Sequence, residues 1–245
     1  MWYSNSESFK STNGYDIDGI WFPRVTSITS IKAKPALYRF YGGLPSFEAG
    51  EEMKEKSAAE GTLMHDTVEQ ILLGNSIEVP PQTKPAIDEL MKFLSRYKIT
   101  TLQTEELLVN KRHRYAGTMD AFAEIFGKKG VLDIKTSTAI YRDYGIQTAA
   151  YAEALHEQGH ENLTRWILRI DQHRPCLKCS ARLREKGGFS KIRSGSKKCL
   201  HEFGPPRGDV ELKELHGLEQ DTRAFLASKA LWEWENDYWL QQVGY

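Results

Sequence analysis

Three charged residues in two neighbouring segments have types and spacing that could support metal-assisted chemistry. In "VLDIKTS", Asp133 and Lys135 lie two residues apart, so on a strand both side chains leave the same face. Asp120, in "GTMDAF", belongs to the preceding predicted strand. Two carboxylates on one face repel each other, whereas a divalent cation lets both stay ionised and leaves the lysine to steer a water or a phosphate oxygen. For either segment alone, a solvated strand face with a salt bridge is the simpler interpretation.

The relation between Asp120 and Asp133 depends on the turn between their strands. If residues 127–130 ("GKKG") form the whole turn, the two aspartates share a face but lie about four positions out of register. A bulge or a different turn must then bring them together.

Other polar residues nearby could complete such a site. Glu105 and Glu106 offer a third carboxylate on the strand before Asp120. Gln147 and Tyr151 are one turn apart on a predicted helix and face the same way, although helix packing is the ordinary use of such a pair. His65 lies in the amphipathic segment "GTLMHDTVEQ", where an isolated histidine more often fills a gap in the core.

The three cysteines form one local cluster. Cys176 and Cys179 make a C-x-x-C pair, and Cys199 is followed by His201, which together supply enough ligands for a tetrahedral Zn²⁺ site. His173 is an alternative fourth ligand. An odd number of clustered cysteines suits a metal site in a reducing compartment better than a disulfide framework, so we expect a cytoplasmic protein.

The elements that must position these residues follow from the periodicity of apolar residues, capping residues and turn signals. Together they predict a mixed sheet flanked by helices. In chain order they are a strand turning into a short helix over 21–31, a short helix over 34–43, one long or kinked helix over 46–74, a helix over 84–97, three strands between 104 and 141, a helix over 144–159, a strand over 164–171, a polar and basic insertion over 172–208, a strand over 209–215 and a long closing helix over 218–243.

Composition excludes few classes of function. The 245 residues contain 33 Lys and Arg and 33 Asp and Glu, so no net charge attracts or repels a nucleic acid. No apolar run approaches the roughly 18 residues that a membrane span needs, and the first residues lack the features of a signal peptide. We therefore expect no membrane partner.

Taken together, the motifs resemble those of PD-(D/E)XK nucleases of RecB type. Residues 22–40 are similar to the N-terminal "P-S-V-T" segment of those family members that resemble the mitochondrial genome maintenance exonuclease. In this chain Arg24 stands where a serine is usual. The resemblance covers roughly residues 22–171 and 209–234. Its motifs, in order, are Gly61 to His65, Glu106 with Val109, Gly117 to Asp120, Asp133-Ile134-Lys135-Thr136 and Gln147 with Tyr151.

The resemblance implies a restriction-endonuclease-like fold, with a mixed central sheet flanked by helices, and a role for each motif. His65, Asp120, Asp133 and the carbonyl of Ile134 would bind Mg²⁺ or Mn²⁺. Lys135 would orient or activate the attacking water and stabilise charge on the phosphorane.

The remaining motifs would support that centre. Glu106 would hold a second metal or position the water, with Glu105 as the alternative. Gln147 and Tyr151 would brace the site and contact the substrate strand, and Gly61 would permit close approach of its helix to the strand edge or to the nucleic-acid backbone.

The activity implied is metal-dependent hydrolysis of phosphodiester bonds in DNA, from the ends of single strands, in repair, recombination or replication. A structure-specific endonuclease is one alternative. A nucleic-acid-binding module with an inactive site is another, but Asp120, Asp133 and Lys135 are all present. A small-molecule metalloenzyme is a third.

The insertion over 172–208 departs from the resemblance, since the flanking strands are joined by a short turn in the relatives. Some relatives carry an iron–sulfur cluster on four cysteines, one of them far upstream. This chain has three cysteines and none upstream, which favours Zn²⁺ over a cluster. The insertion is rich in Lys and Arg, and we expect a zinc-stabilised clamp on DNA.

Overall fold

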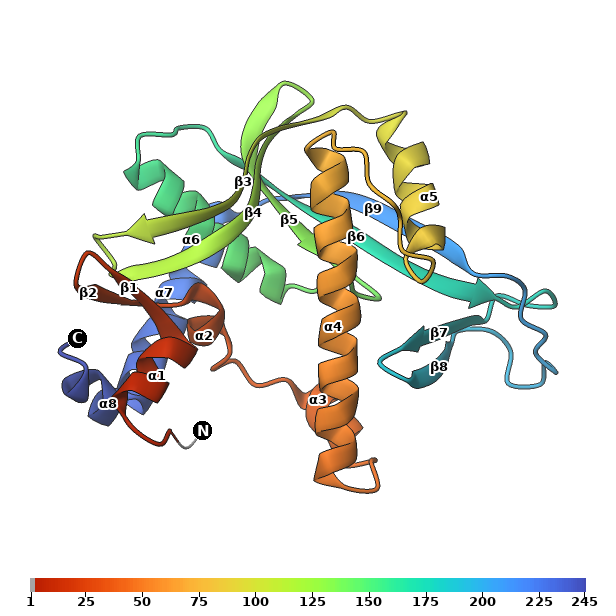
Figure 1. Cartoon of the computed structure of the whole chain (residues 1–245), viewed down its shortest axis with the longest axis horizontal. Helices are drawn as coiled ribbons and strands as arrows, with labels where there is room; N and C mark the ends of the chain where they lie inside the picture. Colours follow the sequence, from red (N-terminus) through yellow and green to blue (C-terminus); the bar gives the residue numbers. More distant parts are fainter. Residues whose placement is uncertain (1–2) are drawn as a thin grey trace.

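The computed structural model describes residues 3–245, which form a mixed α/β fold (Figure 1). In chain order the elements are α1 (Ser6–Asn13), β1 (Gly14–Ile17), β2 (Ile20–Pro23), α2 (Val25–Thr29), α3 (Pro35–Tyr41), α4 (Phe47–Leu72), α5 (Lys84–Leu94), β3 (Ile99–Asn110), β4 (Tyr115–Ile125), β5 (Lys128–Lys135), α6 (Asp143–Glu157), β6 (Thr164–Pro175), β7 (Arg182–Lys186), β8 (Phe189–Arg193), β9 (Arg207–Leu215), α7 (Leu218–Glu235) and α8 (Asp237–Gln242).

The central sheet is mostly antiparallel. Its strands are ordered β3-β4-β5-β6, and β9 pairs with β6 on the far side from β5. Only β5 and β6 pair in parallel among the described strands, and α6 makes the crossover between them, since a parallel pair cannot be joined by a tight turn. The predicted mixed sheet with flanking helices is thereby confirmed.

Two clusters of buried apolar side chains hold helices against this sheet. The first packs α1, α2, α6, α7 and α8 together and against strand residues such as Leu108, Met119 and Val131. The second packs α4 and α5 against Ala121, Leu132 and other strand residues. In Figure 1, α4 and α5 lie together on one side of the molecule, and α1, α2, α7 and α8 gather on the other. β5 is consequently buried on both faces along most of its length.

Most predicted elements are confirmed with small shifts of their ends. The long helix is α4, and the side chain of Ser46 caps it by accepting a hydrogen bond from the N–H of Ala49. The helix predicted over 84–97 ends at Leu94, and β3 begins at Ile99, before the predicted start.

Two predictions of secondary structure are corrected, and one segment for which none was made, before residue 21, is added. The polar N-terminal stretch forms α1 and β1, with Asn5 capping the helix. The closing helix is broken at Asn236, which leaves the helical conformation and whose side chain donates to the carbonyl of Trp232. The polar insertion contains the β7–β8 hairpin, and β6 itself runs on to Pro175.

The turn between β4 and β5 also differs from the expected "GKKG" turn. Ile125 pairs with Lys128, so the turn contains only Phe126 and Gly127. Both have positive φ, 54° and 73°, which is the geometry of a two-residue turn whose twist matches that of a hairpin. The lysines of "GKKG" therefore belong to β5, and the register of Asp120 relative to Asp133 changes with them.

Among the described residues, no helix is both long enough and apolar enough to cross a membrane.

Candidate active site and candidate metal centre

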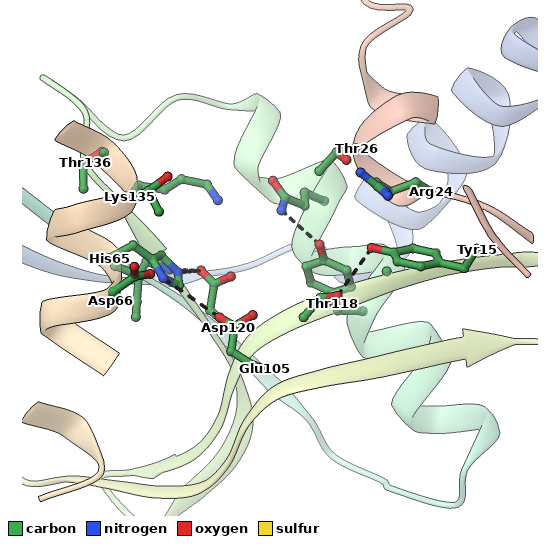
Figure 2. A pocket seen from close by; sticks show the side chains of 16 residues that line it. Tyr15, Arg24, Thr26, His65, Asp66, Glu105, Thr118, Asp120, Lys135 and Thr136 are labelled. Atoms are coloured by element: carbon green, nitrogen blue, oxygen red, sulfur yellow. Dashed lines mark hydrogen bonds and ion pairs between the residues drawn. The ribbon is translucent and has the colours of Figure 1, made fainter. Parts of the chain in front are cut away.

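A cavity of about 520 Å³ opens where β3, β4 and β5 meet α4 and α6 (Figure 2). Residues from seven elements line it, including β1 and α2. His65, Asp120, Lys135, Gln147 and Tyr151 all contribute to its wall. The structure therefore brings together predicted site residues that lie up to 86 positions apart in the chain.

The two predicted aspartates lie where β4 and β5 separate. Regular pairing ends at Ala121 and Leu132, and one more step of that register would set Asp120 opposite Asp133. Instead, the backbone N–H of Ile134 donates a 2.6 Å hydrogen bond to Oδ2 of Asp120. The aspartate thus fills the gap between the diverging strands, and the corrected turn is the reason it reaches that position.

Asp133 is fully buried and, unlike its neighbours Ile134 and Lys135, does not belong to the cavity wall. Its Oδ1 accepts a 2.7 Å hydrogen bond from Nζ of Lys135, whereas its Oδ2 is buried with no hydrogen-bond partner. A buried carboxylate oxygen without a partner is costly unless a cation or donor reaches it. Asp133 thus has one oxygen left to coordinate a cation.

Burial and neighbouring charges set the ionisation of this group of residues. Burial raises the pKa of Asp133 to about 7, and the adjacent Lys135 and His65 only partly oppose that effect. Burial also raises the pKa of Asp120, but the hydrogen bond with His65 and the charge of Lys135 outweigh it, so that its pKa lies below the ordinary value. Asp120 is therefore ionised at neutral pH, and Asp133 is the carboxyl whose charge the site disfavours.

His65 approaches the aspartates from α4. Its Nε2 lies 3.3 Å from Oδ2 of Asp120, and its Nδ1 lies 3.9 Å from Oε1 of Glu105. The hydrogen bond with Asp120 raises the pKa of His65 despite its partial burial. Glu69, one turn further along α4, completes a group with His65 and Glu105 whose ligand atoms all lie within 4.8 Å of one another.

Glu69 was not predicted as a ligand. The sequence feature that could have identified Glu69 is its spacing of four residues from His65, which places both side chains on one face of the helix.

Between the two candidate glutamates, the structure places Glu105 in the cavity wall and Glu106 outside it. Glu106 lies opposite Met119, a residue of the first core cluster, and its Oε2 is buried without a hydrogen-bond partner. Glu105 has a φ of 48°, in the left-handed region that residues other than glycine seldom adopt and that is common at functional sites. The local backbone of β3 therefore favours the alternative glutamate over the one first predicted.

Gln147 and Tyr151 form a pair on α6, as predicted. Nε2 of Gln147 donates to the Tyr151 hydroxyl at 3.1 Å. Burial raises the pKa of Tyr151 far above its ordinary value, so the hydroxyl keeps its proton. Space for the ring depends on Gly117, because a Cβ there would lie 2.9 Å from Cε1 of Tyr151 and 3.0 Å from Cγ2 of Val25.

Further residues of the cavity were not assigned a role from sequence. The hydroxyls of Tyr15 and Thr118 lie 3.4 Å apart, and the Arg24 guanidinium stacks over the Tyr15 ring with its centre 4.7 Å from the ring centroid (Figure 2). Arg24 is a cation at the wall of the same cavity. No pattern around Tyr15 in the sequence signals this position.

A second group of potential ligands lies in the insertion. Cys176, Cys179, Cys199 and His201 bring their ligand atoms within 4.8 Å of one another, which is compatible with a structural zinc site. Sγ of Cys179 lies 3.4 Å from Nδ1 of His201. The alternative ligand His173 pairs with Arg207 in the sheet and is not in this group.

The backbone supports thiolate chemistry at this second site. The N–H of Lys178 points at Sγ of Cys176, and the N–H of Ala181 points at Sγ of Cys179, both at 3.4 Å. Burial raises the pKa of the Cys176 thiol, but the hydrogen bonds from Lys178 and His201 outweigh it and bring the pKa down to about 6. Burial and the two neighbouring thiols instead raise the pKa of Cys199 to about 11. Thiolates are the form that binds a metal.

Comparison of the chain with protein-family models finds no matching family, and comparison with curated proteins finds no relative.

Proposed function

We propose that this protein is a divalent-metal-dependent deoxyribonuclease of the PD-(D/E)XK type. The observation that carries the proposal is the convergence of Asp120, Asp133 and Lys135 at the separating ends of β4 and β5, with His65 facing them from α4. Acidic residues, a lysine and a histidine in one open cavity are a set suited to phosphodiester hydrolysis.

The residues present fit a hard divalent cation. Oδ2 of Asp133 is buried without a hydrogen-bond partner. Asp120 is held in its ionised form, and Nε2 of His65 lies 3.3 Å from the Asp120 carboxylate. Oxygen ligands with one imidazole suit Mg²⁺ or Mn²⁺. When bound, such an ion lowers the pKa of a coordinated water and offsets charge on the phosphate.

The protein's own groups account for the rest of the proposed chemistry. Lys135 is held by Asp133 and keeps its positive charge, because the neighbouring carboxylates raise its pKa against the effect of burial. An ammonium in that place orients the attacking water and stabilises negative charge that develops on the phosphate oxygens. Gln147 and Tyr151 present amide and hydroxyl groups to the substrate from α6.

The proposed substrate is single-stranded DNA with a free end, in repair, recombination or replication. This part rests on the resemblance of the ordered motifs to RecB-type nucleases, including those like the mitochondrial genome maintenance exonuclease. A structure-specific endonuclease and an inactive DNA-binding module are the alternatives that the experiment below separates.

We propose further that the four-residue group of the insertion binds Zn²⁺. Three thiols and one imidazole lie within 4.8 Å of one another, and this is the number and kind of ligands that a closed tetrahedral zinc site takes. An iron–sulfur cluster ordinarily takes four cysteines, and the chain has three.

The test is degradation of end-labelled linear single strands and of closed circular DNA with added Mg²⁺ or Mn²⁺. Asp133→Ala and Lys135→Ala are compared with the intact protein and with Lys129→Ala, an exposed lysine on the same strand. Degradation of linear DNA alone, abolished in the two site variants and kept in the control, supports the exonuclease. Cutting of circles supports the endonuclease, and tight binding without cleavage by the intact protein rejects the enzyme.

A further inference from the structure

The β7–β8 hairpin gathers its positive charges on one face. Residues 182, 184 and 186 of β7 alternate with the others and share a face, and their partners on β8 share it with them. Arg182 pairs with Arg193, and Arg184 pairs with Lys191. At the turn end, Lys186 pairs with Phe189. The face therefore carries five cations and one aromatic ring.

Like charges that lie directly opposite each other destabilise a two-stranded hairpin, so nearby anions are needed to offset the repulsion. The cations of β7, the inner strand, have such anions within the protein. Arg184 contacts Asp171 at 2.9 Å, and Arg182 lies 3.4 Å from Asp209. The outer strand does not, because no carboxylate among residues 3–245 comes within 4.0 Å of Lys191 or Arg193. Both outer residues are exposed.

The tip of the hairpin is attached to the wall of the candidate active site. Nζ of Lys186 donates to the carbonyl of Thr136 at 2.9 Å and lies 3.0 Å from its hydroxyl. Thr136 directly follows Lys135 and lines the cavity. On the other side, the N–H of Gly187 donates to the carboxylate of Glu60 on α4 at 3.1 Å. These hydrogen bonds make the hairpin a bridge between α4 and the residue that follows β5, and Figure 1 shows the tip of the hairpin beside α4.

The base of the hairpin is attached to the cysteine group. β7 begins three residues after Cys179, and the N–H of Cys176 donates to the carbonyl of Ala181 at 2.8 Å. The cysteine group and the active-site wall therefore hold the two ends of the same short hairpin.

Resting on the proposed nuclease function, we infer that the cationic face of β7–β8 binds the phosphates of a single nucleic-acid strand and leads it to the cavity, with Lys186 as the positioning residue at the inner end. Lys191 and Arg193 would contact phosphates outside the cavity. The aromatic ring of Phe189, packed at 5.4 Å against Phe40, lies where a base of the same strand can stack.

The first experiment measures binding of a fluorescent single-stranded oligonucleotide as a function of salt, without Mg²⁺ or Mn²⁺ so that no hydrolysis occurs. The variant is Lys191→Gln/Arg193→Gln. The matched control is Lys197→Gln/Lys198→Gln, which removes the same charge from exposed residues of the same insertion. We expect the hairpin variant to bind about tenfold more weakly at low salt, with a slope of log K against log salt shallower by about 1.4. Equal binding by the two variants, or no binding by the intact protein, overturns the inference.

The second experiment tests Lys186 as a positioning residue. Lys186→Met should raise KM for a short single strand about tenfold, while kcat changes by less than about twofold. Lys186→Arg, which keeps the positive charge, should have a KM close to that of the intact protein. A fall in kcat with unchanged KM would point to a structural role and reject the assignment. If binding depends on the hairpin but the intact protein cleaves nothing, the proposed function fails and the binding surface stands. If it cleaves normally in every variant, the inference alone fails.

Discussion

The backbone N–H of Ile134 donates to the carboxylate of Asp120 at 2.6 Å, which joins β4 to β5 just beyond the point where their regular pairing ends. The bond holds Asp120 in the gap between the strands, directed at His65, and the next residue along β5 is Lys135. One hydrogen bond thereby links the histidine from α4 with the charged end of β5.

The buried carboxyl of Asp133 should make stability depend on pH. Burial raises its pKa from 3.8 to about 7. Between these values the folded protein binds more protons than the unfolded chain, so stability without added Mg²⁺ or Mn²⁺ falls as pH rises through that window. In Asp133→Asn this fall should be smaller by up to about 4 kcal/mol, with activity lost. Urea unfolding of the intact protein and of Asp133→Asn, both supplied with Zn²⁺, at the two ends of this pH range measures the difference. An identical pH dependence of stability in the two proteins would contradict the prediction.

Binding of Mn²⁺ should release a proton from His65. The hydrogen bond with Asp120 raises the pKa of this histidine above 6.5, and a metal requires the neutral ring. Affinity for Mn²⁺ should therefore rise with pH through the pKa of His65. Titration calorimetry at neutral pH in buffers of different ionisation enthalpy counts the released protons. His65→Gln should release fewer, and an unchanged count would exclude His65 as a ligand.

Glu105 should matter more for activity than Glu106. Glu105 lines the cavity and lies near His65, whereas Glu106 packs opposite Met119. Glu105→Gln is expected to lower kcat/KM by about 10–100-fold, as is common for groups that support a metal site. Glu106→Gln is the matched control and should stay within about threefold. The reverse order of effects would restore Glu106 as the functional residue.

Gly117 should be required for the position of Tyr151. A Cβ at Gly117 would lie 2.9 Å from the Tyr151 ring, and both groups are buried, so Gly117→Ala forces the ring or α2 to move. We expect a loss of about 1–3 kcal/mol in stability together with reduced activity. Gly43→Ala is the control, since its Cβ would meet only ordinary contacts at 3.5 Å. Thermal unfolding and cleavage rates of both variants decide the point.

The zinc assignment predicts one Zn²⁺ per chain, measurable by elemental analysis of the purified protein. His201→Ala should lose the metal, and His173→Ala should keep it, because only His201 lies with the three cysteines. Loss of binding in the His173 variant, or a coloured protein with iron, would refute the Cys₃His site.

The order of helices and strands was largely predictable from the sequence because it depends on local signals. Ser46 as a cap with Gly74 after the last turn marks α4, and the alternating segments between residues 104 and 141 mark three strands. The residue types of the site, two aspartates with a lysine and the cysteine group, were also identified this way, and for the same reason: each motif is a short local pattern.

Only the tertiary structure decided how these motifs meet. The two-residue turn at Phe126 sets the register of Asp120, and the left-handed conformation of Glu105 directs that residue instead of Glu106 into the cavity. The contact of Lys186 with Thr136 joins residues 50 positions apart. Such features depend on strand register and on packing between distant segments, whose energies belong to the whole fold, so no local pattern of residues determines them.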